Sequence, residues 1–379
     1  MKQEVAYTQN TILQEAITDL CTQLKNPLSS YQLVIFFASA IYDFSVLTEE
    51  FNKLFPTAEV VGVSSGGEIT RKGFTKRGLL LTTMTDDNTK VSGVILDDLN
   101  SFPIIHKPQI EEALKKSHID TTKPNYTDHC FALSFINGLK NLEEIFLSIF
   151  YAIIGDRNFK LIGSSAGDDY RFYKTKVSLN GKVSVTGAVI LFINTTKKFK
   201  FYKQNIFKPS GKTLNITKAD IQNRTILEID HNPPLTSYAE TLGVSSTTLI
   251  NTMLDHPLGR MYGDDMYITS LAGFNQDKTL NMRTRVFPNS TLDILEPDDI
   301  MAVCTDTCKR INDDFETPGF IFFIICICNV IGYDKRDLCG EISALYNDRF
   351  ATFCGLASCG EQLGTVHMSQ TTLALVMEE

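Results

Sequence analysis

Three stretches of the chain repeat the same order of apolar and polar segments. Each begins with a continuous apolar run, which is typical of a strand buried on both faces, and continues with an amphipathic segment of helical spacing and a second apolar run. These segments are residues 32–39, 45–55 and 58–63, then 129–135, 142–154 and 160–163, and more loosely 320–328, 338–346 and 353–356. The pattern predicts strand, helix and strand, three times over.

Each second strand leads into a loop of small residues that contains an acid. The loops are Ser64–Glu68, Ser164–Asp169 and Ser358–Glu361. Glycine supplies backbone angles that other residues resist, and an acid in such a loop lies where backbone N–H groups are uncovered.

Further strands follow each loop. We predict antiparallel pairs at 79–83 with 91–96, around a polar turn at 86–88, and at 175–179 with 188–193, around Asn180-Gly181. Residues 371–377 close the chain as a strand.

These elements together predict an α+β fold. We expect mixed, largely antiparallel sheets packed with flanking helices, built from repeated β-α-β-loop-β-β units. Between the second and third units, Pro233-Pro234 opens a predicted helix, strands surround a turn at 275–278, and residues 296–314 form an amphipathic helix. The predicted division is an N-terminal extension at 1–30, a first domain at 31–225 and a second at 226–379.

Composition narrows the class of protein. The 379 residues are 43% hydrophobic and 21% charged, which fits a globular chain, and the net charge of −8 argues against a dedicated nucleic-acid binder. The longest apolar run, 320–331, is too short to span a membrane, and the N-terminus lacks the apolar stretch of a signal peptide. Nine cysteines without framework spacing fit a reducing compartment, so we expect a cytoplasmic protein.

The local motifs that would indicate a catalytic, cofactor or metal site fail a test of spacing or of structural context. Ser210-Gly211-Lys212-Thr213 ends like a P-loop, but Ile206 stands where its first glycine belongs. Residues 62–66 match the Gly-x-Ser-x-Gly elbow of hydrolases, but a strand rather than a helix is predicted to follow. The late cysteines, from Cys326 to Cys359, lack metal-site spacing, and no haem-attachment motif occurs. We therefore predict neither a catalytic residue nor a metal site.

The motifs taken together resemble the FIST domain proteins, with both the N-terminal and the C-terminal FIST parts. The resemblance is carried by Val61–Ile69, Ile162–Asp169, Thr217–Asp220, Ile226–Ile229, Pro233–Tyr238, His256–Gly259, Cys359–Glu361 and His367–Thr371. It covers roughly residues 30 to 379.

The resemblance implies a sensory module of signal transduction rather than an enzyme. Such modules occur in bacteria and some eukaryotes and are proposed to bind small ligands such as amino acids. The chain has no room for an output domain, so its output is expected to pass through a separate partner protein. Some bacterial members are similar to a haem-binding nitric-oxide sensor that acts on a histidine kinase, which leaves haem as an alternative cofactor. A hydrolase-like enzyme is a third alternative.

The chemistry of the three loops suits a zwitterionic ligand. We expect loop N–H groups at Gly66, Gly67, Ala166 and Gly167 to hold a carboxylate, and a loop acid to pair with an ammonium group. Arg283 or Arg285 supplies a carboxylate clamp. The predicted ligand-binding residues are Ser64, Ser65, Gly66, Gly67, Glu68, Ser164, Ser165, Gly167, Asp168, Asp169, Arg283, Gly360, Glu361, His367 and Thr371. This hypothesis requires the three loops to converge around one cavity.

Overall fold

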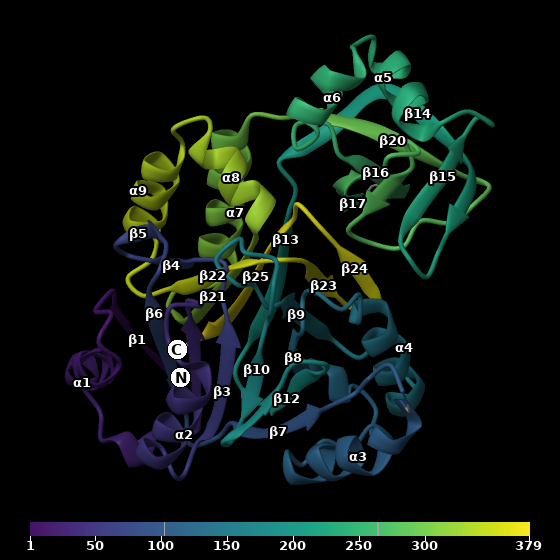
Figure 1. Cartoon of the computed structure of the whole chain (residues 1–379). Helices are drawn as coiled ribbons and strands as arrows, with labels where there is room; N and C mark the ends of the chain where they lie inside the picture. The colour runs from purple at the N-terminus through teal and green to yellow at the C-terminus, as the bar shows by residue number, and fades with distance from the viewer. Residues whose placement is uncertain (102, 264) are drawn as a thin grey trace.

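The computed structural model describes residues 1–101, 103–263 and 265–379. Within these residues, three six-stranded sheets share one strand order (Figure 1). The first sheet runs β1 (Lys2–Thr8), β6 (Leu79–Thr85), β2 (Leu33–Ala38), β3 (Glu59–Ser64), β10 (Val177–Leu179), β11 (Lys182–Ser184). The second runs β7 (Lys90–Leu96), β12 (Ala188–Asn194), β8 (Cys130–Ile136), β9 (Leu161–Ser165), β23 (Glu361–Leu363), β24 (Val366–Met368). The third runs β13 (Phe199–Gln204), β25 (Thr372–Glu378), β21 (Pro318–Cys326), β22 (Cys354–Ser358), β4 (Glu68–Thr70), β5 (Gly73–Thr75).

A parallel strand pair with a helical crossover lies inside each sheet. The pairs are β2 with β3, β8 with β9, and β21 with β22. Their crossovers are α2 (Phe44–Leu54), α4 (Glu143–Ile154), and α8 (Ile327–Asp334) followed by α9 (Cys339–Arg349). The parallel strands are buried on both faces, which explains why they read as continuous apolar runs in the sequence.

The three units exchange hairpins in a closed cycle. The β4–β5 hairpin of the first unit extends the third sheet, the β10–β11 hairpin of the second extends the first sheet, and the β23–β24 hairpin of the third extends the second sheet. Each unit therefore completes the sheet of another. The order of donation returns to its start, which gives the assembly a pseudo-threefold arrangement.

One face of every sheet contributes to a common core. At its centre lie three fully buried rings, Phe37, Phe135 and Phe322, on the equivalent strands β2, β8 and β21. Their ring centroids are 5.4 to 6.2 Å apart. Burying such a side chain contributes roughly 1.5–3 kcal/mol, so this contact is a main attachment between the three sheets.

A separate lobe is inserted into the third unit, between β13 and α7 (Ile300–Asp314). Its sheet runs β17 (Asp265–Thr269), β16 (Leu258–Tyr262), β20 (Ser290–Pro297), β14 (Phe207–Asp220), β15 (Thr225–Ile229), β19 (Leu280–Met282), β18 (Leu271–Phe274). Two helices, α5 (Pro234–Leu242) and α6 (Ser246–Thr252), pack on it, and the apolar cluster between them draws on residues 214–294 alone. Figure 1 shows this lobe, residues 207–297, standing away from the three sheets.

The predicted fold class and the repeated unit are confirmed, whereas two strand pairings are wrong. β6 and β7 do not pair, since they lie in the first and second sheets. Asn180-Gly181 does form a tight turn, with φ of 48° and 84°, but it joins β10 to β11, and β12 lies in the second sheet. The turn chemistry marks a reversal of the chain without specifying the partner strand.

The N-terminal residues, expected to form an extension, are the edge strand of the first sheet. β1 pairs with β6 along its whole length, and α1 (Leu13–Gln23) packs beside it. α3 (Lys107–Lys116) takes the equivalent place before β8, as α7 does before β21. None of the helices in the described part of the chain combines the length and the apolar character that a membrane crossing requires.

Candidate functional site

The three small-residue loops meet at the centre of the molecule, but around direct backbone contacts rather than the single cavity that the ligand hypothesis requires. We call this place the loop junction (residues 64–68, 164–169 and 358–361). The N–H of Gly66 donates to the carbonyl of Ala357 at 3.3 Å, and that of Gly167 to Ser64 at 2.9 Å. The N–H of Cys359 completes the ring by donating to Ser165 at 3.0 Å. Each loop is thus held by the next one.

The centre of the loop junction is closed by backbone contacts rather than open to a ligand. Gly66 and Gly167 use their N–H groups within the ring, and the N–H of Ala166 donates to Ile136 at 2.8 Å. A methyl group added to Gly167 would lie 2.6 Å from the Gly66 nitrogen, so the backbones are already in contact. These N–H groups are therefore not free to hold a carboxylate, which differs from our expectation.

Two of the loop acids are buried, and burial raises the pKa of both. Glu68 is 1% exposed and accepts from the Ser65 hydroxyl at 2.6 Å and from the Gly78 N–H at 3.2 Å. Burial, assisted by Asp169, raises the pKa of Glu68 to about 8. Burial likewise raises the pKa of Glu361 well above its ordinary value. Burial thus works against the negative charge with which either carboxyl would pair with an ammonium group.

The two aspartates of the second loop hold backbone instead. The carboxylate of Asp168 accepts from the N–H groups of Phe172, Tyr173 and Lys174 at 2.6 to 2.9 Å. Asp169 accepts from the Ser39 hydroxyl at 2.6 Å and from the Ala40 N–H at 2.8 Å. Asp168 therefore stabilises the turn into β10, and Asp169 ties the same loop to the segment that follows β2.

The remaining predicted residues near the loop junction also make internal contacts. Ser164 donates to Ser358 at 3.1 Å, and Thr371 donates to Asn205 at 3.2 Å. At Gly360, an added methyl group would lie 2.5 Å from the His367 ring, so this glycine permits the close approach of that histidine. Ser165 donates to Glu143 at 2.9 Å.

Glu143 belongs to a buried charge cluster that sequence analysis missed. Arg224, at the turn between β14 and β15 of the lobe, is 4% exposed and donates to Glu143 at 2.6 Å and also to Glu144. It also donates to the carbonyl of Arg283 at 2.7 Å. Burial raises the pKa of Glu143, but Arg224 and then His367 more than offset this and hold it at about 2. The only signal in the sequence was the pair of acids opening α4, which is ordinary at a helix N-terminus.

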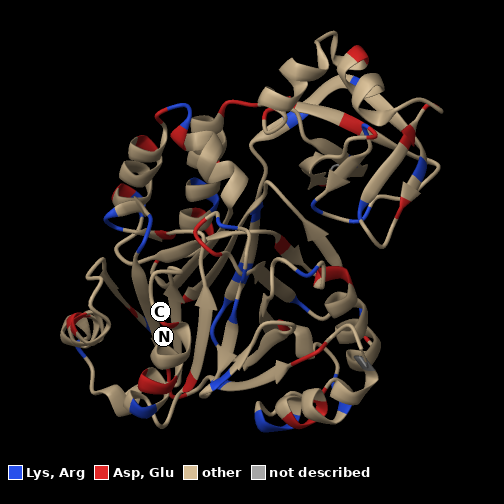
Figure 2. Cartoon of the chain, viewed as in Figure 1, with Lys and Arg blue, Asp and Glu red and all other residues tan. Residues whose placement is uncertain are grey.

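A cavity of about 480 Å³ opens beside this cluster, between the lobe and the second sheet. Its charged and ionisable lining residues are Glu144 from α4, Arg260 from β16, Arg285 from the segment after β19, and His367 from β24. Figure 2 shows the same arrangement, with basic residues on the edge of the lobe that faces α4 and acidic residues where α4 begins.

The cavity joins opposite charges to aromatic surface. The N–H of Arg285 donates to Glu144 at 2.8 Å, and the guanidinium of Arg260 lies 5.5 Å from the centre of the Phe287 ring. Among the described residues, no carboxylate lies within ion-pair distance of the Arg260 or Arg285 side chain. Both arginines can therefore bind an acid from outside. His367 and Arg285, both named from the sequence, line this cavity, whereas Arg283 stacks on Phe172 at 5.4 Å.

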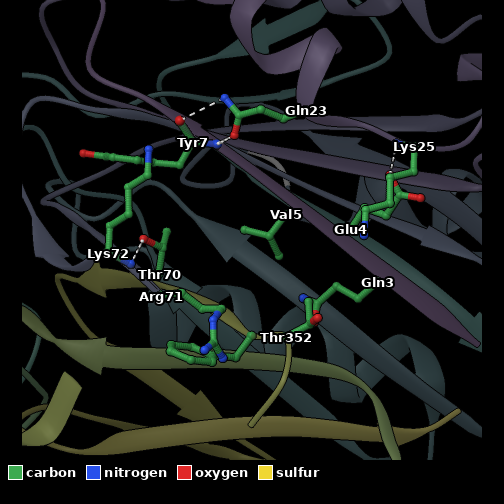
Figure 3. A pocket seen from close by; sticks show the side chains of 11 residues that line it. Gln3, Glu4, Val5, Tyr7, Gln23, Lys25, Thr70, Arg71, Lys72 and Thr352 are labelled. Atoms are coloured by element: carbon green, nitrogen blue, oxygen red, sulfur yellow. Dashed lines mark hydrogen bonds between the residues drawn. The ribbon is translucent and has the colours of Figure 1, made fainter. Parts of the chain in front are cut away.

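A second cavity, of about 220 Å³, lies between β1 and the turn of the β4–β5 hairpin (Figure 3). Several of its polar groups already have partners, although the buried Tyr7 hydroxyl has none among the described residues. Arg71 donates to the carbonyl of Phe350 at 2.6 Å, and Gln23 bridges the backbone of Tyr7 with hydrogen bonds of 3.0 and 3.2 Å. Lys72 lies over the Tyr7 ring at 5.3 Å. Lys72 thus ties the first hairpin to β1, Arg71 ties it to the end of α9, and Gln23 ties α1 to β1. Unlike the cavity beside Glu144, this one does not, in the part of the chain that the structure describes, pair free arginines with an acid that faces them.

Comparison with solved structures finds distant similarity. A cyanuric acid hydrolase matches over 99% of both chains with a TM-score of 0.36 and 7% identity. A cyanuric acid hydrolase from A. caulinodans matches 54% of this chain and 72% of its own, with a TM-score of 0.30 and 7% identity.

Sequence comparison is more informative about the family. An uncharacterized protein of Methanocaldococcus jannaschii is 23% identical over 324 residues, which is 80% of this chain and 62% of that protein. The chain thus spans less than two thirds of this relative. The model of the FIST N domain matches residues 32–232, and that of the FIST C domain matches residues 234–363. The chain belongs to the FIST family, with a FIST N domain followed by a FIST C domain.

Proposed function

We propose that this protein senses a small carboxylate-bearing ligand, such as an amino acid, in the cavity between the lobe and the second sheet. FIST domains are sensory domains of signal transduction. The observation that carries the proposal is the lining of that cavity, where two arginines without a carboxylate partner among the described residues face Glu144.

The chemistry of the lining matches a zwitterion. A guanidinium group recognises a carboxylate through two parallel hydrogen bonds, and Arg260 and Arg285 both supply one. Glu144 already accepts from Arg224 and from the Arg285 N–H, and a carboxylate has room for a further donor such as an ammonium group. Tyr267 and Phe287 provide apolar surface for the rest of the ligand. The volume of about 480 Å³ lies within the usual range for small-molecule sites.

The position of the cavity gives the ligand a way to act. Glu144 and His367 belong to the second sheet and its helix, whereas Arg260 and Arg285 belong to the lobe. A ligand that contacts both sides stabilises one placement of the lobe, which a separate partner protein such as a histidine kinase then reads. A ligand shifts such an equilibrium only by its difference in affinity for the two placements.

A ligand screen by thermal unfolding tests the proposal. An amino acid or small carboxylate at 100 times its dissociation constant adds about 2.7 kcal/mol to the free energy of unfolding. Arg285→Gln and Arg260→Gln each weaken this effect, by about tenfold in affinity. Arg157→Gln, which removes an exposed arginine away from the cavity, leaves it unchanged.

The absence of any stabilising ligand in such a screen, or equal affinity in both cavity variants, contradicts the proposed site. A Soret band in the purified protein selects the haem sensor instead.

A further inference from the structure

The cyclic exchange of hairpins creates three equivalent interfaces, each with a hollow between a crossover helix and either the donated hairpin or the segment that leads into it. The β4–β5 hairpin faces α8 across a cavity of about 70 Å³. The segment that leads into β10 faces the start of α2 across a cavity of about 180 Å³. The β23–β24 hairpin faces α4 across the 480 Å³ cavity described above. The three hollows share none of their lining residues, so the loop junction is surrounded by separate sites rather than by one shared cavity.

The three hollows differ in charge. In the smallest, Lys76 lies 3.9 Å from Asp334, so the charges compensate each other. The hollow beside α2, which we call the basic hollow, contains three cations, Arg171, Lys174 and Lys176, and one acid, Asp168. Among the described residues, none of these cations is within ion-pair distance of a carboxylate. With three cations and one acid, the formal charge of the lining is +2.

The one acid in the basic hollow is already engaged. The oxygens of Asp168 accept three backbone N–H groups of its own loop, at 2.6 to 2.9 Å. Its carboxylate therefore shapes the loop, and the side chains of Arg171 and Lys174 remain available to an external anion. Lys176 lies 5.7 Å from the centre of the Phe44 ring, which places its ammonium group over the start of α2.

The basic hollow lies where the fold favours ligands. It is lined by Ala38 and Ser64, the last residues of the parallel strands β2 and β3. In α/β sheets, ligands bind in the crevice beyond the carboxyl ends of parallel strands.

The loop that supplies the cations distinguishes this hollow from the other two. It is longer than the loops before β4 and β23, and its backbone is left-handed at Asp169, Tyr170 and Phe172, with φ of 54°, 64° and 51°. Non-glycine residues adopt such angles at a cost and concentrate at functional sites. Where the other two units have a short loop, the second unit therefore has a longer one that carries cations and whose backbone is held by Asp168.

We propose that the basic hollow binds a compact dianion of the phosphate type, independently of the ligand cavity between lobe and second sheet. The sources of such an anion are inorganic phosphate and the phosphoryl group of a small monoester. Three cations and a volume of about 180 Å³ suit a tetrahedral dianion better than a monocarboxylate.

Isothermal titration of the full chain with inorganic phosphate, at constant ionic strength, tests this site. The double variant Arg171→Gln/Lys174→Gln loses at least about tenfold in affinity. Lys182→Gln removes an exposed lysine of the β10–β11 hairpin that does not line the hollow, and keeps the wild-type affinity. Because Arg171 and Lys174 are exposed, the double variant keeps the wild-type melting temperature, which circular dichroism checks.

Two further probes distinguish the sources. Tighter binding of glycerol 3-phosphate than of phosphate identifies a monoester, and the reverse identifies the free ion. Acetate binding as tightly as phosphate, no saturable binding of either phosphate probe, or equal affinity in the double variant overturns the proposal. Arg285→Gln leaves phosphate binding intact, so failure of the ligand cavity and failure of the basic hollow are separate results.

Discussion

At the scale of single residues, the loop junction contains two acids whose protonated form is favoured by burial. Glu68 and Glu361 occupy equivalent places, at the first residue of β4 and of β23, and both are at most 1% exposed. Among the described residues neither has a cation within ion-pair distance, so burial dominates and raises the pKa of each carboxyl. The third equivalent position, at the first residue of β10, holds Val177, which has no group that titrates.

This burial makes stability depend on pH. In the unfolded chain Glu68 loses its proton near pH 4.5, whereas the folded protein keeps it until about pH 8. Between these values the folded state binds the additional proton, so raising the pH lowers the free energy of unfolding, by at most about 1.4 kcal/mol per pH unit. Glu68→Gln removes the titrating group while an amide can still accept from Gly78 and donate to Ser65. We expect the stability of this variant relative to wild type to increase from about pH 5 to about pH 8.

Urea unfolding of both proteins over this pH range measures the effect. Glu361 still titrates in the variant, so some pH dependence remains. Glu316→Gln, at an exposed glutamate, provides the control and follows the wild-type curve. A Glu68→Gln curve parallel to wild type contradicts a neutral Glu68 in the folded protein.

At the scale of elements, the sequence predicts whether a segment forms a helix or a strand better than it predicts which strand a segment pairs with. The buried strand β2 and the Pro-initiated α5 were predictable because burial and proline chemistry act locally. The partner of β7 was not, since a polar turn indicates only that the chain reverses. The exchange of hairpins depends on contacts such as Glu361 with Ser164, almost two hundred residues away, for which one chain carries no local signal.

The candidate site was likewise predictable only in part. The glycine-rich loops were recognisable, and the structure brings them together as the hypothesis supposed, but not around the shared cavity that it placed between them. The closed contact between the loops was not predictable, because it depends on which carbonyl accepts the hydrogen bond from each loop N–H. Arg224 and Glu143 escaped detection because an arginine in a turn and an acid at a helix start are ordinary on exposed surfaces.

The ring of loop hydrogen bonds has a direct test at Gly167. An alanine there places its methyl group 2.6 Å from the Gly66 nitrogen and 3.0 Å from its Cα, so one backbone must move. We expect Gly167→Ala to lower the free energy of unfolding by about 2 kcal/mol or more. Gly340→Ala, in α9 with nothing within 4 Å, is the control and stabilises by up to about 1 kcal/mol. Chemical unfolding that finds the two variants equally stable refutes the closed loop junction.

At the scale of the whole molecule, the three sheets and the lobe differ in how they depend on each other. No unit of the three-sheet core completes its own sheet, because each takes its outer hairpin from another unit. The core is therefore expected to unfold as one cooperative body. The lobe has its own apolar cluster, and the chain enters and leaves it at one place, where the Asp298 N–H donates to the Ile206 carbonyl at 3.0 Å.

The lobe is consequently expected to fold when expressed alone as residues 207–297. The remaining core, with 207–297 replaced by a short glycine-serine linker, is expected to fold but to be less stable than the full chain. Met266, Ile268 and Leu295 of the lobe pack in the apolar cluster of the third sheet, and this contact is lost. Arg224 is lost as well, which leaves Glu143 without the partner that holds its pKa at about 2.

Adding Glu143→Gln to the excised core separates these two losses. Removing one partner of a buried ion pair costs about 3–5 kcal/mol, and neutralising the remaining acid recovers part of it. The comparison is by circular dichroism and calorimetry of the full chain, the lobe, and the excised core with and without Glu143→Gln. A ligand that stabilises the full chain is expected to stabilise neither piece alone, because the charged residues of the proposed cavity come from both pieces. If the excised core stays unfolded even with Glu143→Gln, the core needs the apolar contact with the lobe in order to fold, and the loss of the charge cluster is not the cause.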